Sequence, residues 1–281
     1  MLLAVAFYTL LERKVLGYIQ ARKGPNKPGP LGLMVPFGDA LKLITKECNI
    51  PGIGNRLIFL IGPFISMIIP IMMWSLYPSP YSPLTFKFSA LFFVCLSTVG
   101  VYAVLGSGWS SNRGYSFLGS IRAVAQSVSY EVSLSVLIVI WVIFYNYELS
   151  VPKYLAIGCF FFIPMTMTFI SALAETNRSP FDFSEGESEL VRGFNTEYSA
   201  VPFVMIFLAE YISILFISLL VRLLFNMTSV NDLAFFMLLW ALMFLYARGT
   251  LPRLRYDQLM FISWKCLLPA SLCFAGMTLL R

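Results

Sequence analysis

The sequence contains no histidine and carries few charged residues, which make up 12% of the chain. The absence of histidine excludes haem ligation by this residue and argues against a zinc site. A soluble domain usually carries about 25% charged residues. With 58% hydrophobic residues and a mean hydropathy of +0.79, the composition indicates a chain whose main solvent is lipid.

Cysteine is also scarce, and no nucleotide-binding motif is present. None of the five cysteines has CxxC spacing, and most lie in apolar runs, so we interpret them as small buried apolar residues. The short glycine pattern Gly52-Ile-Gly54 lacks the preceding strand that a dinucleotide fingerprint requires. We therefore expect no tightly bound haem, iron–sulfur cluster, flavin, nucleotide or metal.

Long apolar runs dominate what is present. Backbone polar groups cannot stay unpaired in hydrocarbon, so a spanning chain forms helices or a closed barrel. Unbroken runs of about 20 residues indicate helices. The fold class predicted is all-α, a polytopic integral membrane protein with a single membrane domain over residues 1–281. The eight predicted transmembrane helices are 1–19, 57–78, 88–108, 121–145, 154–174, 198–221, 230–248 and 259–280.

The distribution of positive charge supports this count. If the spans alternate, the loops 12–56, 109–122, 175–197 and 248–265 fall on one side and hold sixteen of the twenty Lys and Arg residues. The positive-inside rule places that side in the matrix or cytoplasm. This asymmetry accounts for the net charge of +6, so no nucleic-acid partner is expected. The long loops share this side, which is where we expect function.

Two acidic residues lie inside predicted spans. Glu131 is roughly 14 Å into the fourth span at 1.5 Å per residue, and Glu210 is similarly deep in the sixth. Tyr130 and Tyr211 are their neighbours. A charge at this depth costs a few kcal/mol, which favours a proton or ion relay. The alternative is a neutral, hydrogen-bonded carboxyl that only joins helices.

One face of the fourth span carries polar residues. Arg122, Gln126 and Tyr130 recur at i, i+4 and i+8 and therefore share that face. The alternative for Arg122 is a side chain that extends from the helix entrance to the membrane surface.

An acidic loop follows the fifth span. Residues 174–199 contain six of the fourteen acids, and Pro180 is expected to prevent a helix from continuing through them. Clustered carboxyls raise one another's pKa and can share protons near neutral pH. A solvated charged loop is the alternative, although the apolar residues of the loop indicate packing. The six acids are Glu175, Asp182, Glu185, Glu187, Glu189 and Glu197.

The first long loop contains an amphipathic stretch. Leu33, Phe37, Leu41 and Ile44 have helical spacing, with charged residues between them. This pattern predicts a surface amphipathic helix in the first matrix-side loop. It could cover an entrance from the lipid or serve only as an anchor.

Several long strings resemble one known family nearly end to end and in the same order. They are LLERKVLGYIQARKGPNKPG, RAVAQSVSYEVSL, LAETNRSPFDFSEGESELVRGFNTEYS, LAEY and RGTLPRLRYDQLM. They resemble the family of membrane subunit 1 of respiratory complex I, the proton-pumping NADH:ubiquinone oxidoreductase. The absence of a signal or transit peptide pattern is typical of a mitochondrially encoded animal chain in the inner membrane; the bacterial plasma membrane is the alternative location.

This resemblance implies a function and partners. The family forms the ubiquinone access path and chamber and links quinone reduction to proton translocation through buried acids. It works beside the hydrophilic quinone-module subunits and neighbouring membrane subunits, surrounded by lipids. Ubiquinone is the substrate, and this chain would hold no redox centre of its own.

The resemblance also implies roles for individual residues. The quinone path is carried over to Arg13, Arg22, Phe37, Asp39 and Glu47. The relay is carried over to Glu131, Glu175, Asp182, Glu185, Glu187, Glu210 and Tyr211. Arg178, Arg122, Arg192 and Arg255 are expected to be ion-pair partners of these acids.

Three alternative functions remain open at this point. The equivalent membrane subunit of an ion-pumping hydrogenase-type complex would differ in its co-purifying partner. A stand-alone secondary transporter would contain inverted repeats and broken helices, and no clear repeat is visible between 1–140 and 141–281. A structural anchor would tolerate neutral substitution of Glu131 and Glu210.

Overall fold

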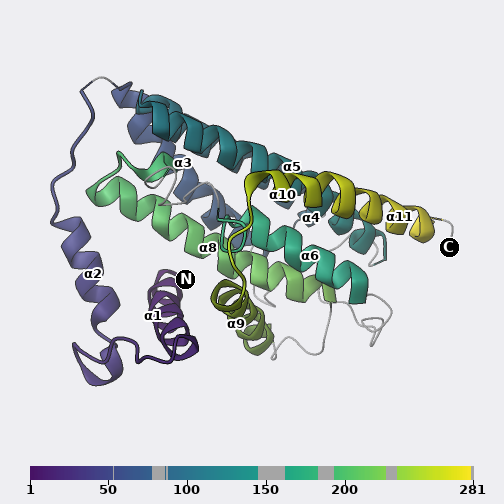
Figure 1. The fold of residues 1–281 in the computed structure, drawn as a ribbon, viewed down its shortest axis with the longest axis horizontal. Helices are drawn as coiled ribbons and strands as arrows, with labels where there is room; N and C mark the ends of the chain where they lie inside the picture. The colour runs from purple at the N-terminus through teal and green to yellow at the C-terminus, as the bar shows by residue number, and fades with distance from the viewer. Residues whose placement is uncertain are drawn as a thin grey trace.

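The computed structural model describes residues 1–52, 54–77, 86, 88–144, 162–182, 193–225 and 233–279, and these residues form helices joined by loops (Figure 1). The longer helices are α1 (Leu2–Ile19), α2 (Val35–Ile44), α3 (Arg56–Met73), α4 (Ser89–Ser110), α5 (Gly114–Phe144), α6 (Phe162–Glu175), α8 (Ala200–Phe225), α9 (Leu233–Thr250), α10 (Tyr256–Phe261) and α11 (Leu268–Leu279). Short helical turns are η1 (Pro30–Gly32), η2 (Trp74–Leu76) and η4 (Gly193–Asn195), and a π-helical segment, η6 (Ile262–Leu267), joins α10 to α11.

Helix occurs within every one of the eight predicted spans. Five helical stretches in the described residues are long and apolar enough to cross a membrane: Arg56–Leu76, Ser89–Ser110, Gly114–Trp141, Ala200–Leu224 and Tyr256–Thr278. The all-helical class is therefore confirmed for these residues, whereas the count of eight spans stays a prediction. The helix of the fourth predicted span, α5, begins at Gly114 rather than at residue 121.

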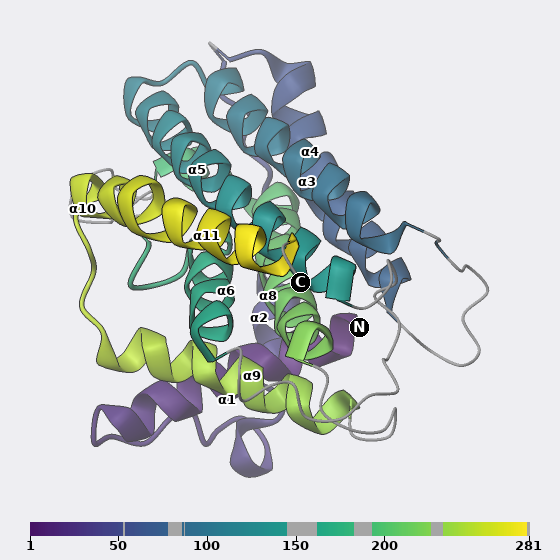
Figure 2. The same ribbon diagram turned by 90° about the vertical axis from the view of Figure 1, so that its right-hand side faces the viewer.

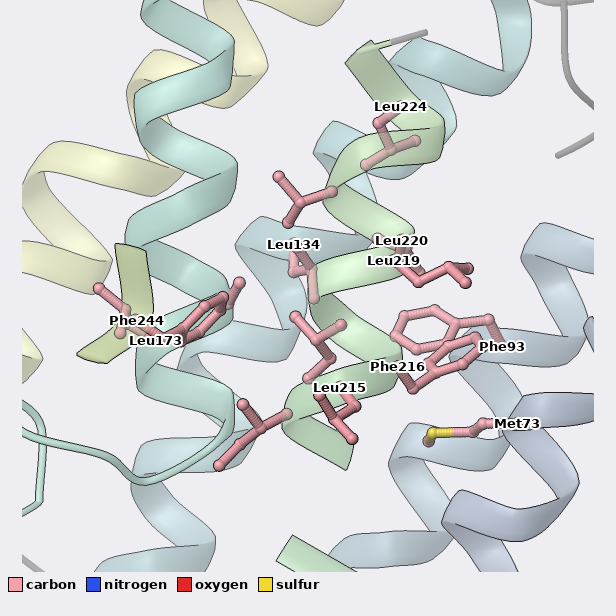
Figure 3. Close-up of a cluster of buried hydrophobic side chains, with 14 of the residues drawn as sticks. Met73, Phe93, Leu134, Leu173, Leu215, Phe216, Leu219, Leu220, Leu224 and Phe244 are labelled. Atoms are coloured by element: carbon pink, nitrogen blue, oxygen red, sulfur yellow. The ribbon is translucent and has the colours of Figure 1, made fainter. Parts of the chain in front are cut away.

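Helix α8 forms the centre of the bundle. Within the stretch of α8 that is apolar enough to span a membrane, 67% of the residues are buried. In the corresponding stretch of α4 only 17% are buried. Figure 3 shows Leu215, Phe216 and Leu219 of α8 between neighbouring helices, with Phe93 of α4 on one side and Leu173 of α6 on the other. The long unbroken apolar run from Ala200 explains why this segment is helical and why it can be buried on all sides.

Helices α1 and α9 lie side by side along one edge of the bundle, across the direction of α6 and α8 (Figure 2). Both pack against α8. The Tyr8 hydroxyl of α1 donates a hydrogen bond to the Ala241 carbonyl of α9, at 3.1 Å. This arrangement brings the charged end of α1 next to α8 and α9.

The described cysteines are not buried. Cys48, Cys95, Cys266 and Cys273 are all exposed and unpaired in this chain, so their interpretation as buried residues is wrong; Cys159 lies outside the described residues. The physical reason is that an apolar membrane helix exposes part of its surface to lipid, where a small apolar side chain is stable. Hydrophobicity therefore does not report burial within the bundle.

The predicted amphipathic helix is present as α2. Its Phe37, Leu41 and Ile44 are exposed in the isolated chain, and Pro36 is its only buried residue. An exposed apolar face is what a helix at a membrane surface would have. The position of α2 relative to a bilayer stays a prediction.

Candidate functional site

A tight turn after α6 positions the first part of the acidic loop. The α6 helix ends at Glu175, and Asn177 has a φ of 50°, the left-handed conformation in which asparagine often terminates helices. The Phe181 amide then donates to the Arg178 carbonyl at 2.8 Å. The chain therefore turns back on itself, as Pro180 predicts, and carries Arg178 towards α8.

Arg178 contacts two polar residues of α8, Glu210 and Tyr211. Its guanidinium nitrogen Nη2 lies 3.7 Å from a carboxylate oxygen of Glu210, and its Cζ lies 4.5 Å from the centre of the Tyr211 ring. The first contact is an ion pair and the second a cation–π interaction. The structure thus brings together Arg178, Glu210 and Tyr211, three residues assigned to the relay from the sequence.

Glu12 extends this cluster into α1. The Tyr211 hydroxyl donates a 2.5 Å hydrogen bond to Glu12, and Arg248 of α9 forms an ion pair with the other Glu12 oxygen. Glu12 is only 5% exposed. A buried carboxylate is stable when it is paired and hydrogen-bonded in this way.

Sequence reasoning missed Glu12 and Arg248 as functional residues. In the sequence Glu12 stands beside Arg13 and Lys14 within the predicted first span, 1–19. The signal that could have found it is the one used for Glu131 and Glu210, namely an acidic residue within a membrane helix. Glu12 and Arg248 are 236 positions apart in the chain, so no local pattern reports their pairing.

Glu210 also lines a cavity whose wall is mostly apolar and contains a few polar side chains. It has a volume of about 160 Å³, and its lining includes Ser97, Glu175, Asn177 and Glu210. One buried carboxylate oxygen of Glu175 and the side-chain oxygen of Asn177 have no hydrogen-bond partner within the described part of the chain. Water needs about 30 Å³ per molecule in the liquid, so the cavity can hold several waters next to these acceptors.

Glu131 is connected to this cavity through Ser97. The Ser97 hydroxyl of α4 donates a 2.6 Å hydrogen bond to the Glu131 carboxylate of α5. Because Ser97 also lines the cavity, the cavity joins all three acids: Glu210 and Glu175 at its wall, and Glu131 behind Ser97.

Asp182 belongs to a neighbouring charged contact. It is 8% exposed and lies 3.4 Å from Arg253. Arg255, expected as a partner of the relay acids, instead pairs with Asp257 on the exposed surface at 3.2 Å. The charged segment before α10 therefore approaches the acidic loop through Arg253.

The residues assigned to the quinone path lie at the α1–α2 corner and along the first loop. Arg13 and Asp39 form a half-exposed ion pair at 2.8 Å, and the ring of Phe37 meets Phe7 of α1 edge to face at 6.1 Å. Arg22 is exposed and hydrogen-bonds to Gln20. Glu47 is exposed further along the loop, where its carbonyl accepts a hydrogen bond from Ser199.

Not every predicted residue can be placed in this cluster. Arg122 is half-buried on α5. Glu185, Glu187, Glu189 and Arg192 lie outside the described residues.

Comparisons with known proteins show which family this chain is similar to. The family model for NADH dehydrogenase matches residues 1–279. The chain is 48% identical to NADH-ubiquinone oxidoreductase chain 1 of Aedes aegypti, over 96% of this chain and 89% of the relative. Identity is 46% to the protein of the same name in Artemia franciscana (97% and 92%) and 46% to that in Balaenoptera physalus (96% and 90%).

The chain belongs to the NADH dehydrogenase family. This confirms the resemblance found in the sequence. Membership in this family, together with helices able to span a membrane, makes the chain a multi-pass protein of the mitochondrial inner membrane. Glu210 and Tyr211 lie within the α8 stretch that is long and apolar enough to span a membrane.

Proposed function

We propose that this NADH dehydrogenase family member is a core membrane subunit of the proton-pumping NADH:ubiquinone oxidoreductase that links quinone reduction to proton translocation. The observation that carries the proposal is a connected series of titratable groups. It runs from Glu12 through Tyr211, Arg178 and Glu210 to the cavity beside Glu175 and Glu131.

The distances within this series suit proton transfer. Tyr211 and Glu12 are already hydrogen-bonded, at 2.5 Å, which is within the range needed for a proton to pass between them. Arg178 cannot give up its proton near neutral pH. Its role is electrostatic: its positive charge lies 3.7 Å from the Glu210 carboxyl group.

Two cavities lie beside this series of groups and offer room for water. The cavity of about 160 Å³, here called the large cavity, is lined by Glu210 and by Ser97, whose hydroxyl bonds to Glu131. Water in it would carry protons between Glu210 and the Ser97–Glu131 pair. A smaller cavity of about 10 Å³ is lined by Tyr8, Glu12, Arg178 and Arg248, which is room for about one water molecule. Glu175 faces the large cavity with an unpaired oxygen and is our candidate for an intermediate proton carrier.

The α1–α2 corner is our candidate for the ubiquinone access path. A quinone has a polar head with two carbonyl acceptors and an apolar isoprenoid tail. The Arg13 guanidinium offers hydrogen-bond donors, and the Phe7–Phe37 pair offers an apolar surface beside it. Arg22, Asp39 and Glu47 would line the same path along the first loop.

Electrons would reach the quinone from other subunits. In the proposed function this chain holds no redox centre and shares the quinone chamber with hydrophilic subunits and with neighbouring membrane subunits and lipids. Several relatives are named NADH-ubiquinone oxidoreductase chain 1. That name favours this role over a hydrogenase-type subunit, a transporter or an anchor.

A photoreactive ubiquinone analogue tests the access path in the intact complex. We expect cross-links to this chain between Arg22 and Glu47 or at the start of α8, and competition by excess unlabelled ubiquinone. Phe37→Ala is expected to lower this labelling because it removes apolar surface. Met277 of α11, which is 58% exposed in this chain, serves as the control for non-competed labelling. Competed labelling confined to other subunits would contradict the assignment.

A further inference from the structure

The Gln126 side chain joins two ends of one loop. It is 1% exposed on α5, and its Nε2 donates to the Ala174 carbonyl at 3.1 Å and to the Phe181 carbonyl at 2.7 Å. The opposite amide orientation would point Oε1 at both carbonyl oxygens, where nothing could be donated. Both amide hydrogens are therefore used to close the segment 174–181.

The closed segment carries the residues that reach the relay. Glu175 and Asn177 line the large cavity, and Arg178 lies against Glu210 and Tyr211 of α8. The two hydrogen bonds of Gln126 go to backbone carbonyls and not to the side chains of Glu175, Asn177 or Arg178. It acts on the segment's two ends, and the position of Arg178 follows from where those ends are held.

Tyr130 supports the same segment one helical turn further along α5. Its ring meets Phe181 edge to face at 5.6 Å, and its hydroxyl donates to the Leu259 carbonyl at 2.9 Å. The Leu254 amide donates to the Pro180 carbonyl at 3.0 Å. One face of α5 and the chain before α10 therefore hold the loop from two directions.

Arg178 depends on this support because its contacts are sensitive to small shifts. The ion pair to Glu210 is already at 3.7 Å, near the outer limit of such a contact. A displacement of about 1 Å can cost a positioned group about 100-fold in rate. The loop must therefore be held firmly for Arg178 to act on Glu210.

We infer that Gln126 is a positioning residue for proton coupling: its two hydrogen bonds hold the 174–181 segment so that Arg178 stays against Glu210 and Tyr211. This inference rests on the proposed function of the relay. Gln126 exchanges no proton in it. The polar face of α5 seen in the sequence thus has a role that Arg122 alone does not explain.

Gln126→Glu in the intact complex tests this inference. Glutamate has the same shape but, when ionised, has no hydrogen to donate. Gln126→Asn keeps the amide on a side chain one methylene shorter and should have an intermediate effect. Ser135→Ala on the same helix is the control, since its hydroxyl bonds only within α5, to Val132.

Two measurements are needed on these variants. Amide hydrogen exchange reports how firmly residues 176–182 are held, and the number of protons translocated per electron reports coupling. We expect Gln126→Glu to speed exchange in this segment at least about tenfold, because a carboxyl group can donate at most one hydrogen bond and at least one of the two buried bonds is lost. We expect it to lower the proton-to-electron ratio by about half while the complex still assembles.

The outcomes separate this inference from the proposed function. Unchanged exchange at 176–182 overturns the positioning role. Faster exchange with an unchanged proton-to-electron ratio also overturns it, because a loop that is merely structural would behave this way. The relay itself is judged separately, in Glu210→Gln of the same complex: if that variant pumps normally, the proposed function fails whatever Gln126 does.

Discussion

Replacing Glu210 with glutamine is expected to slow quinone-coupled proton translocation at least about tenfold, because positioned proton-transfer groups typically contribute about 100-fold or more. Glutamine has nearly the same size but cannot release a proton. Arg178 would keep its contact with the Tyr211 ring, so we expect assembly of the complex to be preserved. The measurement is the rate of proton translocation in proteoliposomes, alongside NADH oxidation.

Asp257→Asn is the matched control for this experiment. Asp257 is also acidic and also paired with an arginine, Arg255. Its side chain is 75% exposed, however, and this ion pair includes none of the acids of the relay. We expect this variant to pump like the wild type. A Glu210→Gln complex that pumps at the wild-type rate would show that Glu210 is a structural carboxyl, as in the alternative left open by the sequence.

The second large effect is expected from Glu12→Ala. Removing one partner of a buried ion pair leaves the other charge uncompensated, which costs about 3–5 kcal/mol. We expect the lower end of this range, because the Arg248 side chain is 31% exposed and water can partly replace the lost partner. The Tyr211 hydroxyl also loses its acceptor. The measurement is the amount of assembled complex and its melting temperature.

A double variant separates charge from packing. Glu12→Gln combined with Arg248→Gln leaves no unpaired charge and should recover most of the lost stability. For the exposed pair, Asp257→Asn is expected to change the free energy of unfolding by no more than about 1 kcal/mol. Equal losses in Glu12→Ala and Asp257→Asn would mean that the Glu12–Arg248 pair does not stabilise the bundle.

The sequence predicts the helices because membrane spans have a strong local signal. The run that forms α8 is apolar throughout apart from Glu210 and Arg222, so both the helix and its unusual acid are visible without a structure. The end of α6 is also visible, since Pro180 and Asn177 restrict the backbone locally. The same acid argument led to Glu210 and its neighbour Tyr211, both of which contact Arg178 in the structure, while their role in a relay stays a prediction.

Pairings between distant segments could not be predicted in this way. Tyr211 and Glu12 are 199 positions apart, and their contact depends on how α1 crosses α8. The two hydrogen bonds of Gln126 depend likewise on the return of the loop after α6. Periodicity identifies the face of a helix, but it does not identify which segment that face meets.

The distinction between burial in protein and exposure to lipid was also beyond the sequence. Cys95 and Cys273 lie in apolar helices yet are exposed on this chain. Glu12, by contrast, stands beside Arg13 in a charged run yet is buried. In a membrane protein, hydrophobicity predicts insertion, whereas burial follows from helix packing.

Tyr211→Phe tests the relay most directly, because it removes one hydroxyl and leaves the aromatic ring. The ring keeps its contact with Arg178, and Glu12 keeps its pair with Arg248. Only the hydrogen bond from Tyr211 to Glu12 is lost. In the intact complex we predict normal assembly and a proton-to-electron ratio clearly below that of the wild type. A wild-type ratio in this variant would contradict a proton relay through Tyr211.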